Sequence, residues 1–279
     1  YLDKNDCPFD VNKFQNWYYK SGTPKVFVSQ SWDSKNSILN ISFEQKINGD
    51  VNTEMVIPIL YSCYSRRKKG EPLAENKLFI LDKNIKKLQI HASTEEKDSP
   101  VLSIFRRFSS PVQWESNLSL DDYLFLFLNE NDYFSRWDSG QVLMREIIKN
   151  RINEQRDNLL EVKFINAIKE SIDFLESNDS LFLSTLLTIP GFSELESLFD
   201  KVDPINIYRE SLSFQVLIGN DIIQELKIVA KNLIVNINHE WPMGKGERKL
   251  LGTIWSYIAL AGDRDIQKDC VNSINNSSM

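Results

Sequence analysis

Apolar and polar residues alternate in short runs over the first part of the chain. In the run Ile38–Gln45, for example, Leu39, Ile41 and Phe43 share one face. Successive side chains of a strand point to opposite faces, so such runs predict half-buried β-strands. We expect strands at residues 25–29, 38–45, 54–64, 77–81, 85–91 and 101–108. Short strands at this spacing, with no helix-length segment between them, predict an antiparallel β-sandwich. Because proline cannot donate to a ladder, Pro58 predicts an edge strand or a bulge.

From Ser119 onward the apolar residues recur every three or four positions, which is the helical period. Ser119, Asp121 and Asp122 place an oxygen cap and two acids at a helix start, where free backbone N–H groups favour them. A second helix is expected from about Asp132, and further helices at residues 162–175, 181–189, 192–199, 204–236, 246–261 and 263–275. Short connections between them favour antiparallel neighbours, so the pattern predicts an all-α, solenoid-like array.

The change of period, between residues 103 and 144, predicts an α+β multidomain protein. A length of 279 residues is enough for two ordinary domains. We expect an Ig-like antiparallel β-sandwich at residues 1–115 and an α-helical, superhelical domain at residues 116–279.

Composition narrows the possible partners. The net charge of -6 disfavours nonspecific binding to nucleic acid, which relies on many basic side chains. The basic run Arg66–Gly70 lies between two predicted strands and is interpreted as a solvated hairpin loop. Three cysteines, far apart and in no CxxC pair, fit a reducing compartment and predict a cytoplasmic location. No apolar run approaches the roughly 20 residues that span a bilayer, so no membrane partner is expected.

Catalytic and cofactor motifs are absent from the sequence. It has two histidines, and His239-Glu240 is followed by Trp241, Pro242 and Met243 without the second histidine of an HExxH metal site. We interpret His91 and His239 as structural residues. No GxxxxGK[ST], GxGxxG or GxSxG occurs, and the chain has only 10 glycines, which argues against nucleotide chemistry. The sequence therefore predicts no catalytic, cofactor-binding or metal residue in this chain.

The remaining candidates lie around the change of period. Arg106 and Arg107 end the last predicted strand, and Arg136 stands near the start of the second helix. These arginines could hold a ligand carboxylate, but we favour a structural role in which they join the two domains. Phe105 and Phe108 are expected to close the sandwich, and Pro111 to end its last strand. The predicted junction set is Arg106, Arg107, Phe108, Pro111, Arg136, Trp137, Gly140 and Gln141.

Five segments spread over nearly the whole chain are similar to one known family. They read FQNWYYKSGTPKVFVS, SIFRRFSSPVQW, NDYFSRWDSGQVLMREII, VDPINIYRESLSF and GERKLLGTIWSYIA. In this order and spacing they resemble the C-terminal half of the bacterial aminopeptidase N family, zinc-dependent gluzincin peptidases. The resemblance implies a β-sandwich followed by the first part of a helical cap domain, in a chain shorter than the family's at both ends.

The resemblance also implies a function. The family's zinc ligands and catalytic glutamate belong to a preceding domain, so this chain is expected to be inactive alone. It would place a helical cap over the catalytic cleft of the same polypeptide and limit which peptides enter. The alternative is a stand-alone interaction module whose helical solenoid binds a partner protein.

We further expect Leu250, Ile254, Tyr257 and Ile258 to form an exposed apolar strip that later helices would cover.

Overall fold

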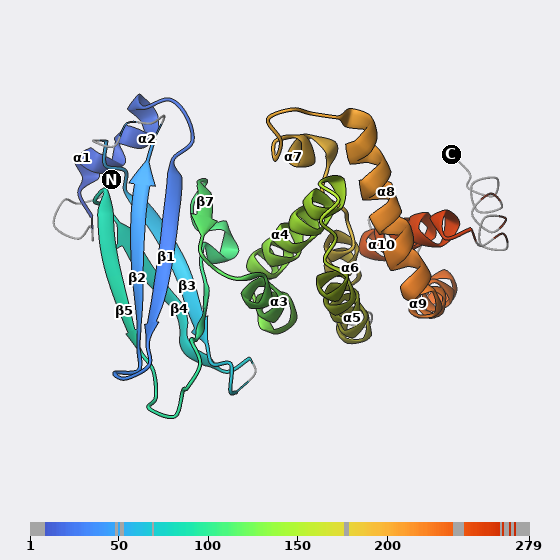
Figure 1. Ribbon diagram of the computed structural model, residues 1–279, viewed down its shortest axis with the longest axis horizontal. Helices are drawn as coiled ribbons and strands as arrows, with labels where there is room; N and C mark the ends of the chain where they lie inside the picture. The colour runs from blue at the N-terminus through green and yellow to red at the C-terminus, as the bar shows by residue number, and fades with distance from the viewer. Residues whose placement is uncertain are drawn as a thin grey trace. The chain divides into compact units, whose positions relative to one another are not determined.

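The computed structural model describes residues 9–47, 50, 53–68, 70–175, 179–236, 243–262, 264, 268 and 271 (Figure 1). The chain divides into two compact units, Tyr1–Arg136 and Trp137–Met279. The first contains all the strands of the described residues, and the second is helical. The α+β class and the order of strands before helices are therefore confirmed.

Two sheets form the sandwich. The four-stranded sheet has the order β5-β2-β1-β7, and the three-stranded sheet has the order β4-β3-β6. Strands β1, β2 and β5 lie side by side in Figure 1. The strands are β1 Lys25–Asp33, β2 Ile38–Lys46, β3 Ile57–Tyr64, β4 Pro72–Leu81, β5 Ile85–His91, β6 Val101–Ser103 and β7 Gln113–Ser116.

The alternation of apolar residues places one face of each sheet in a shared core. Val26 and Phe43 from the larger sheet and Ile59 from the smaller one are fully buried in one apolar cluster. Near the N-terminus, two short helices, α1 (Val11–Phe14) and α2 (Asn16–Tyr19), precede β1. The Trp17 indole of α2 donates to Val56 O at 2.8 Å and packs against the same core.

Pro58 lies in β3, which is the central strand of its sheet rather than an edge, although the same strand carries register shifts between Tyr61 and Tyr64 in its pairing with β4. However, β6 pairs only with Ser62–Tyr64, so it does not reach the proline. Ser110 Oγ donates to Pro58 O at 2.5 Å, and Leu60 N donates to Ser109 Oγ at 3.0 Å. The side chains of Ser109 and Ser110 therefore take the place of a neighbouring strand beside Pro58, which has no backbone N–H group to donate.

The strand expected at residues 101–108 is shorter than predicted. It ends at Ser103, and a 3₁₀ turn, η1 (Arg106–Phe108), follows. The chain then re-enters the larger sheet as β7, which pairs parallel to β1. Pro111 therefore precedes a further strand, and the expectation that it ends the last one is wrong.

Helices α3 (Leu120–Asn129) and α4 (Tyr133–Ile152) follow the sandwich. Ser119 caps α3 as expected: its hydroxyl accepts from Asp122 N at 3.2 Å, and the Asp122 carboxylate accepts from Ser119 N at 2.8 Å. The later helices are α5 Asn158–Leu175, α6 Ser180–Leu186, α7 Phe192–Glu196, α8 Pro204–Asp221, α9 Ile223–Asn236 and α10 Lys245–Leu260.

Two predictions about the helical region are wrong. The single helix expected over 204–236 is broken at the fully buried Ile222, which has φ -112° and ψ 18°. The strip expected to be exposed on α10 is buried, since Leu250, Ile254, Tyr257 and Ile258 are each at most 1% exposed. Helix α10 packs on α6, α8 and α9, which cover that face. The helix expected at residues 263–275 falls mostly outside the described residues.

Candidate functional site

Arg106 is the centre of a buried polar cluster between the sandwich and α3. Its side chain is 2% exposed. One terminal nitrogen, Nη1, donates to Ser62 Oγ and to Asn76 Oδ1 at 2.5 Å. The other, Nη2, donates to Glu130 Oε1 at 2.9 Å and to Asn131 Oδ1. A single cation therefore connects β3, β4 and the residues that follow α3.

Glu130 is the anion of this cluster and is fully buried. Besides Arg106, its Oε1 accepts from Tyr64 OH at 2.7 Å and from Asp132 N at 2.8 Å. Burial, and then the Glu130 charge, raise the pKa of Tyr64, which keeps the phenol protonated as a donor. The cation and the two further donors all meet Oε1, which offsets part of the cost of desolvation, while the buried Oε2 has no partner among the described residues.

Arg107 and Phe108 differ from Arg106 in both backbone and exposure. Phe105, Arg107 and Phe108 have φ of 54°, 55° and 52°, in the left-handed region. Arg107 N donates to Asp132 Oδ1 at 3.0 Å, while its side chain is exposed. Phe105 is fully buried in the sandwich core, but Phe108 is 54% exposed and packs edge-on against Phe134. The expectation that Phe108 closes the sandwich is therefore wrong.

The other predicted junction residues lie in or near α4, apart from Pro111, which is exposed. Arg136 is buried, donates to Phe127 O at 2.8 Å and lies over the Phe127 ring, so it joins α3 to α4. Trp137 is half-buried and Gly140 is buried. Gln141 is buried and donates to Thr188 O, after α6, at 3.0 Å.

Arg66 makes a second contact between the sandwich and α3, which the sequence did not reveal. Its Nε donates to Ser99 O at 3.0 Å, its Nη2 pairs with Asp122 of α3, and its guanidinium lies over the Phe125 ring. The interpretation of the basic run as a solvated loop is therefore wrong for Arg66, although Arg67 and Lys68 are exposed. No local pattern marks the pair with Asp122, because the two residues are 56 positions apart.

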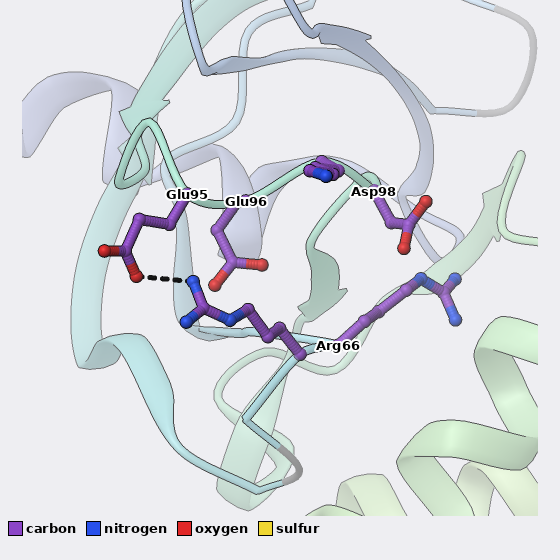
Figure 2. Close-up of a pocket in the computed structure, with 6 residues that line it drawn as sticks. Arg66, Glu95, Glu96 and Asp98 are labelled. Carbon is purple, nitrogen blue, oxygen red and sulfur yellow. Dashed lines mark hydrogen bonds and ion pairs between the residues drawn. The ribbon is translucent and has the colours of Figure 1, made fainter.

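Arg66 also lines a pocket, which Figure 2 shows. The other lining residues are Arg67, Glu95, Glu96, Lys97 and Asp98. Its charges are partly paired: Arg67 binds Glu95, and the buried Glu96 accepts from Ser65 Oγ. Within the residues that the structure describes, no three His, Cys, Asp or Glu side chains are grouped so as to hold a metal ion. The described residues therefore do not fit the zinc ion that the family resemblance implies.

The remaining candidate reactive groups are Cys63 and the two histidines. Cys63 is fully buried, and burial raises the pKa of its thiol to about 12, so the nucleophilic thiolate does not form near neutral pH. His91 is exposed at the end of β5, and His239 lies outside the described residues. Among the described helices, none has the length and apolar character to cross a bilayer.

Family models match both parts of the chain. Residues 22–117 match a domain of unknown function with an Ig-like fold (DUF3458), and residues 120–279 match its companion with ARM repeats (DUF3458_C). The second match alone covers more than half of the chain. The chain belongs to the DUF3458_C family. The Ig-like sandwich and the helical repeats expected from the sequence are both confirmed.

Proteins similar to this DUF3458_C member are named aminopeptidase N. That of Caulobacter vibrioides is 24% identical over 95% of this chain and 29% of its own length. Those of Haemophilus influenzae and Escherichia coli are 23% and 27% identical, over 95% and 73% of this chain. The resemblance to bacterial aminopeptidase N is therefore confirmed. The chain spans about a third or less of the length of these relatives.

A solved structure has the same fold. The Legionella pneumophila aminopeptidase A, determined in complex with aspartic acid, aligns with a TM-score of 0.80 at 19% identity. The alignment covers 94% of this chain and 30% of that chain. The fold described above is therefore one that occurs as part of a longer protein.

Proposed function

We propose that this chain is a noncatalytic part of a zinc aminopeptidase that removes N-terminal residues from peptides. The observation that carries the proposal is the match to aminopeptidase N over 95% of this chain, in a sequence without HExxH. The zinc ion and the catalytic groups would come from another part of the same polypeptide. This chain would contribute the sandwich and the first helices of a cap.

The buried cluster suggests how the cap would be held. Arg106, Glu130 and Tyr64 join the sandwich to the end of α3, and Arg66 with Asp122 joins it to the start of that helix. Two contacts at opposite ends of one helix fix its direction as well as its position. A cap that begins with a helix held in this way would limit the peptides that reach the catalytic cleft.

The first test asks whether this chain lacks the catalytic machinery. The purified chain, supplied with Zn²⁺, should not hydrolyse an alanyl reporter, while Escherichia coli aminopeptidase N serves as the active control. Measurable hydrolysis by this chain would refute its noncatalytic role. If the coding sequence before Tyr1 holds no HExxH segment, the stand-alone interaction module takes the place of this proposal.

The second test concerns access and uses the complete polypeptide. Arg106→Met should loosen the contact between the sandwich and α3. The rate for a long peptide should then rise relative to the rate for a single aminoacyl reporter. Arg67→Met is the matched control, because Arg67 is exposed and its partner Glu95 is exposed too. An unchanged ratio in a folded Arg106→Met variant would refute a role in access.

A further inference from the structure

Backbone strain gathers around one pocket of the sandwich unit. The described residues include six non-glycine residues with positive φ, and four of them, Asn76, Phe105, Arg107 and Phe108, lie in this pocket or next to it. Such conformations persist where the surrounding structure fixes them, and they concentrate at ligand sites. The pocket, of about 570 Å³, is lined by Glu75, Asn76, Arg106, Arg107, Asn131, Asp132 and Tyr133.

Arg106 orients two amides at this pocket. An arginine side chain has only donors, so Asn76 and Asn131 must both turn their Oδ1 atoms toward it. Their Nδ2 groups then point away from Arg106. Asn131 Nδ2 reaches Glu75 Oε1 only at 3.4 Å, and Asn76 Nδ2 has no partner among the described residues. Each NH2 group has two N–H donors, so each amide keeps at least one that could donate to a ligand.

Arg107 adds a cation that the described part of the chain does not neutralise. Arg106 is paired with Glu130, and Asp132 Oδ1 accepts from the backbone N–H groups of Arg107 and Ser135. The exposed Arg107 side chain has neither an ion pair nor a hydrogen bond with the described residues. The half-exposed ring of Tyr133 lines the same pocket.

We propose that this pocket binds the carboxylate of a small peptide, with Arg107 as its bidentate partner and the amides of Asn76 and Asn131 as further donors. The carboxylates of Glu75 and Asp132, which line the same pocket, would repel a doubly charged phosphate more strongly than a singly charged carboxylate, so phosphate fits less well. Aromatic residues beside the arginine supply apolar contact for the rest of the peptide. Because the pocket is formed by this chain alone, the proposal does not depend on the aminopeptidase function.

The test is an NMR titration of the full chain with an N-acetylated dipeptide and with the same dipeptide carrying a C-terminal amide. The acid should bind saturably and shift the resonances of Arg107 and of the Asn76 and Asn131 amides, while the amide should not. No saturable binding of the acid, equal binding of the amide, or tighter binding of inorganic phosphate would each overturn the proposal.

Two variants and a control locate the binding. Arg107→Gln removes the cation, and Asn131→Asp keeps an oxygen for Arg106 while replacing the donor with a negative charge. Each should weaken binding of the acid at least about ten-fold, since a charge-assisted hydrogen bond is lost. Arg67→Gln, at an exposed arginine outside this pocket, should leave the affinity within about two-fold of the original. Unchanged affinity in either pocket variant, with the fold retained, would overturn the site.

Discussion

Arg107 occupies a backbone conformation that suits glycine better than any side chain. Its φ is 55° and its ψ is 27°. An L-residue in this region costs about 1–2 kcal/mol through the contact of Cβ with the following carbonyl, and glycine lacks that contact. We therefore expect Arg107→Gly to be more stable to urea than Arg107→Ala by about 1 kcal/mol.

A matched pair at Lys87 tests whether this difference reflects the left-handed backbone. Lys87 lies in β5 and its side chain is exposed. Glycine weakens a strand, so here the alanine variant should be more stable than the glycine variant by about 0.5–1 kcal/mol. The sign of the difference should thus reverse between the two sites, and the same sign at both would contradict the strain at Arg107.

Asp138 should make stability depend on pH. Burial raises the pKa of this carboxyl from 3.8 to about 6, and nearby Arg145 opposes the rise. The folded chain therefore holds the proton more tightly than the unfolded chain, and stability falls as pH rises from about 4 to about 6. Asp138→Asn removes this partly buried charge, so it should raise the free energy of unfolding by about 1–2 kcal/mol at pH 7.5 and by less at pH 4.5.

The measurement is urea unfolding at both pH values, with Asp200→Asn as the control. Asp200 is exposed, and its substitution should change the free energy of unfolding by less than about 0.5 kcal/mol at either pH. A gain from Asp138→Asn that is equal at pH 4.5 and pH 7.5 would show that the effect is not titration of this carboxyl.

At the scale of helices, α8 and α10 approach closely at Gly219. A Cβ built there would lie 2.9 Å from Tyr257 O, a backbone atom that cannot turn aside. Gly219→Ala should therefore lower the free energy of unfolding by about 1–3 kcal/mol. A Cβ built at Gly252, within α10, would have no other atom within 4 Å. Gly252→Ala should therefore raise the free energy of unfolding by about 0.5–1 kcal/mol, because alanine favours a helix over glycine. Circular dichroism in urea compares the two, and a stabilised Gly219→Ala would contradict the close approach.

Elements with a local signal could be predicted from the sequence. The alternation in β2 and β5 gives their bounds to within a residue, and Ser119 marks the start of α3 through its own side-chain contact. Strand β7 carries no such signal. It is four residues long and depends on parallel pairing with β1, nearly ninety positions earlier. The break at Ile222 does follow turn-favouring residues, Gly219, Asn220 and Asp221, but Gly219 itself lies inside α8, so these residues alone do not place the break.

The polar cluster around Arg106 also has no local signal in the sequence. The sequence singled out Arg106 and Arg107 together because they are adjacent, but the structure buries one and exposes the other. The difference comes from the left-handed backbone of Phe105 and Arg107, which no residue-type preference indicates. The partners Glu130 and Tyr64 come from segments far apart in sequence, so the buried pair follows from the tertiary fold.

At the scale of the whole chain, the division into two compact units predicts that the energetics of the two units are separable. Arg106→Met leaves Glu130 buried without its cation, which should cost about 3–5 kcal/mol. Arg106 belongs to the first unit and Gly219 to the second, and they share no partner among the described residues. The double variant Arg106→Met with Gly219→Ala should therefore lose as much free energy of unfolding as the two single variants together, within about 0.5 kcal/mol.

A second combination shows what coupling looks like. Arg106→Met with Glu130→Gln removes both charges of one buried pair, so its cost should fall below the sum of the single costs by more than about 1 kcal/mol. Urea unfolding followed by circular dichroism measures all of these variants. Additivity for Arg106 with Glu130 would mean that they do not form a pair. Strong coupling between Arg106 and Gly219 would mean that the two units do not keep separate energetics, because a change in one core would then alter the cost of a change in the other.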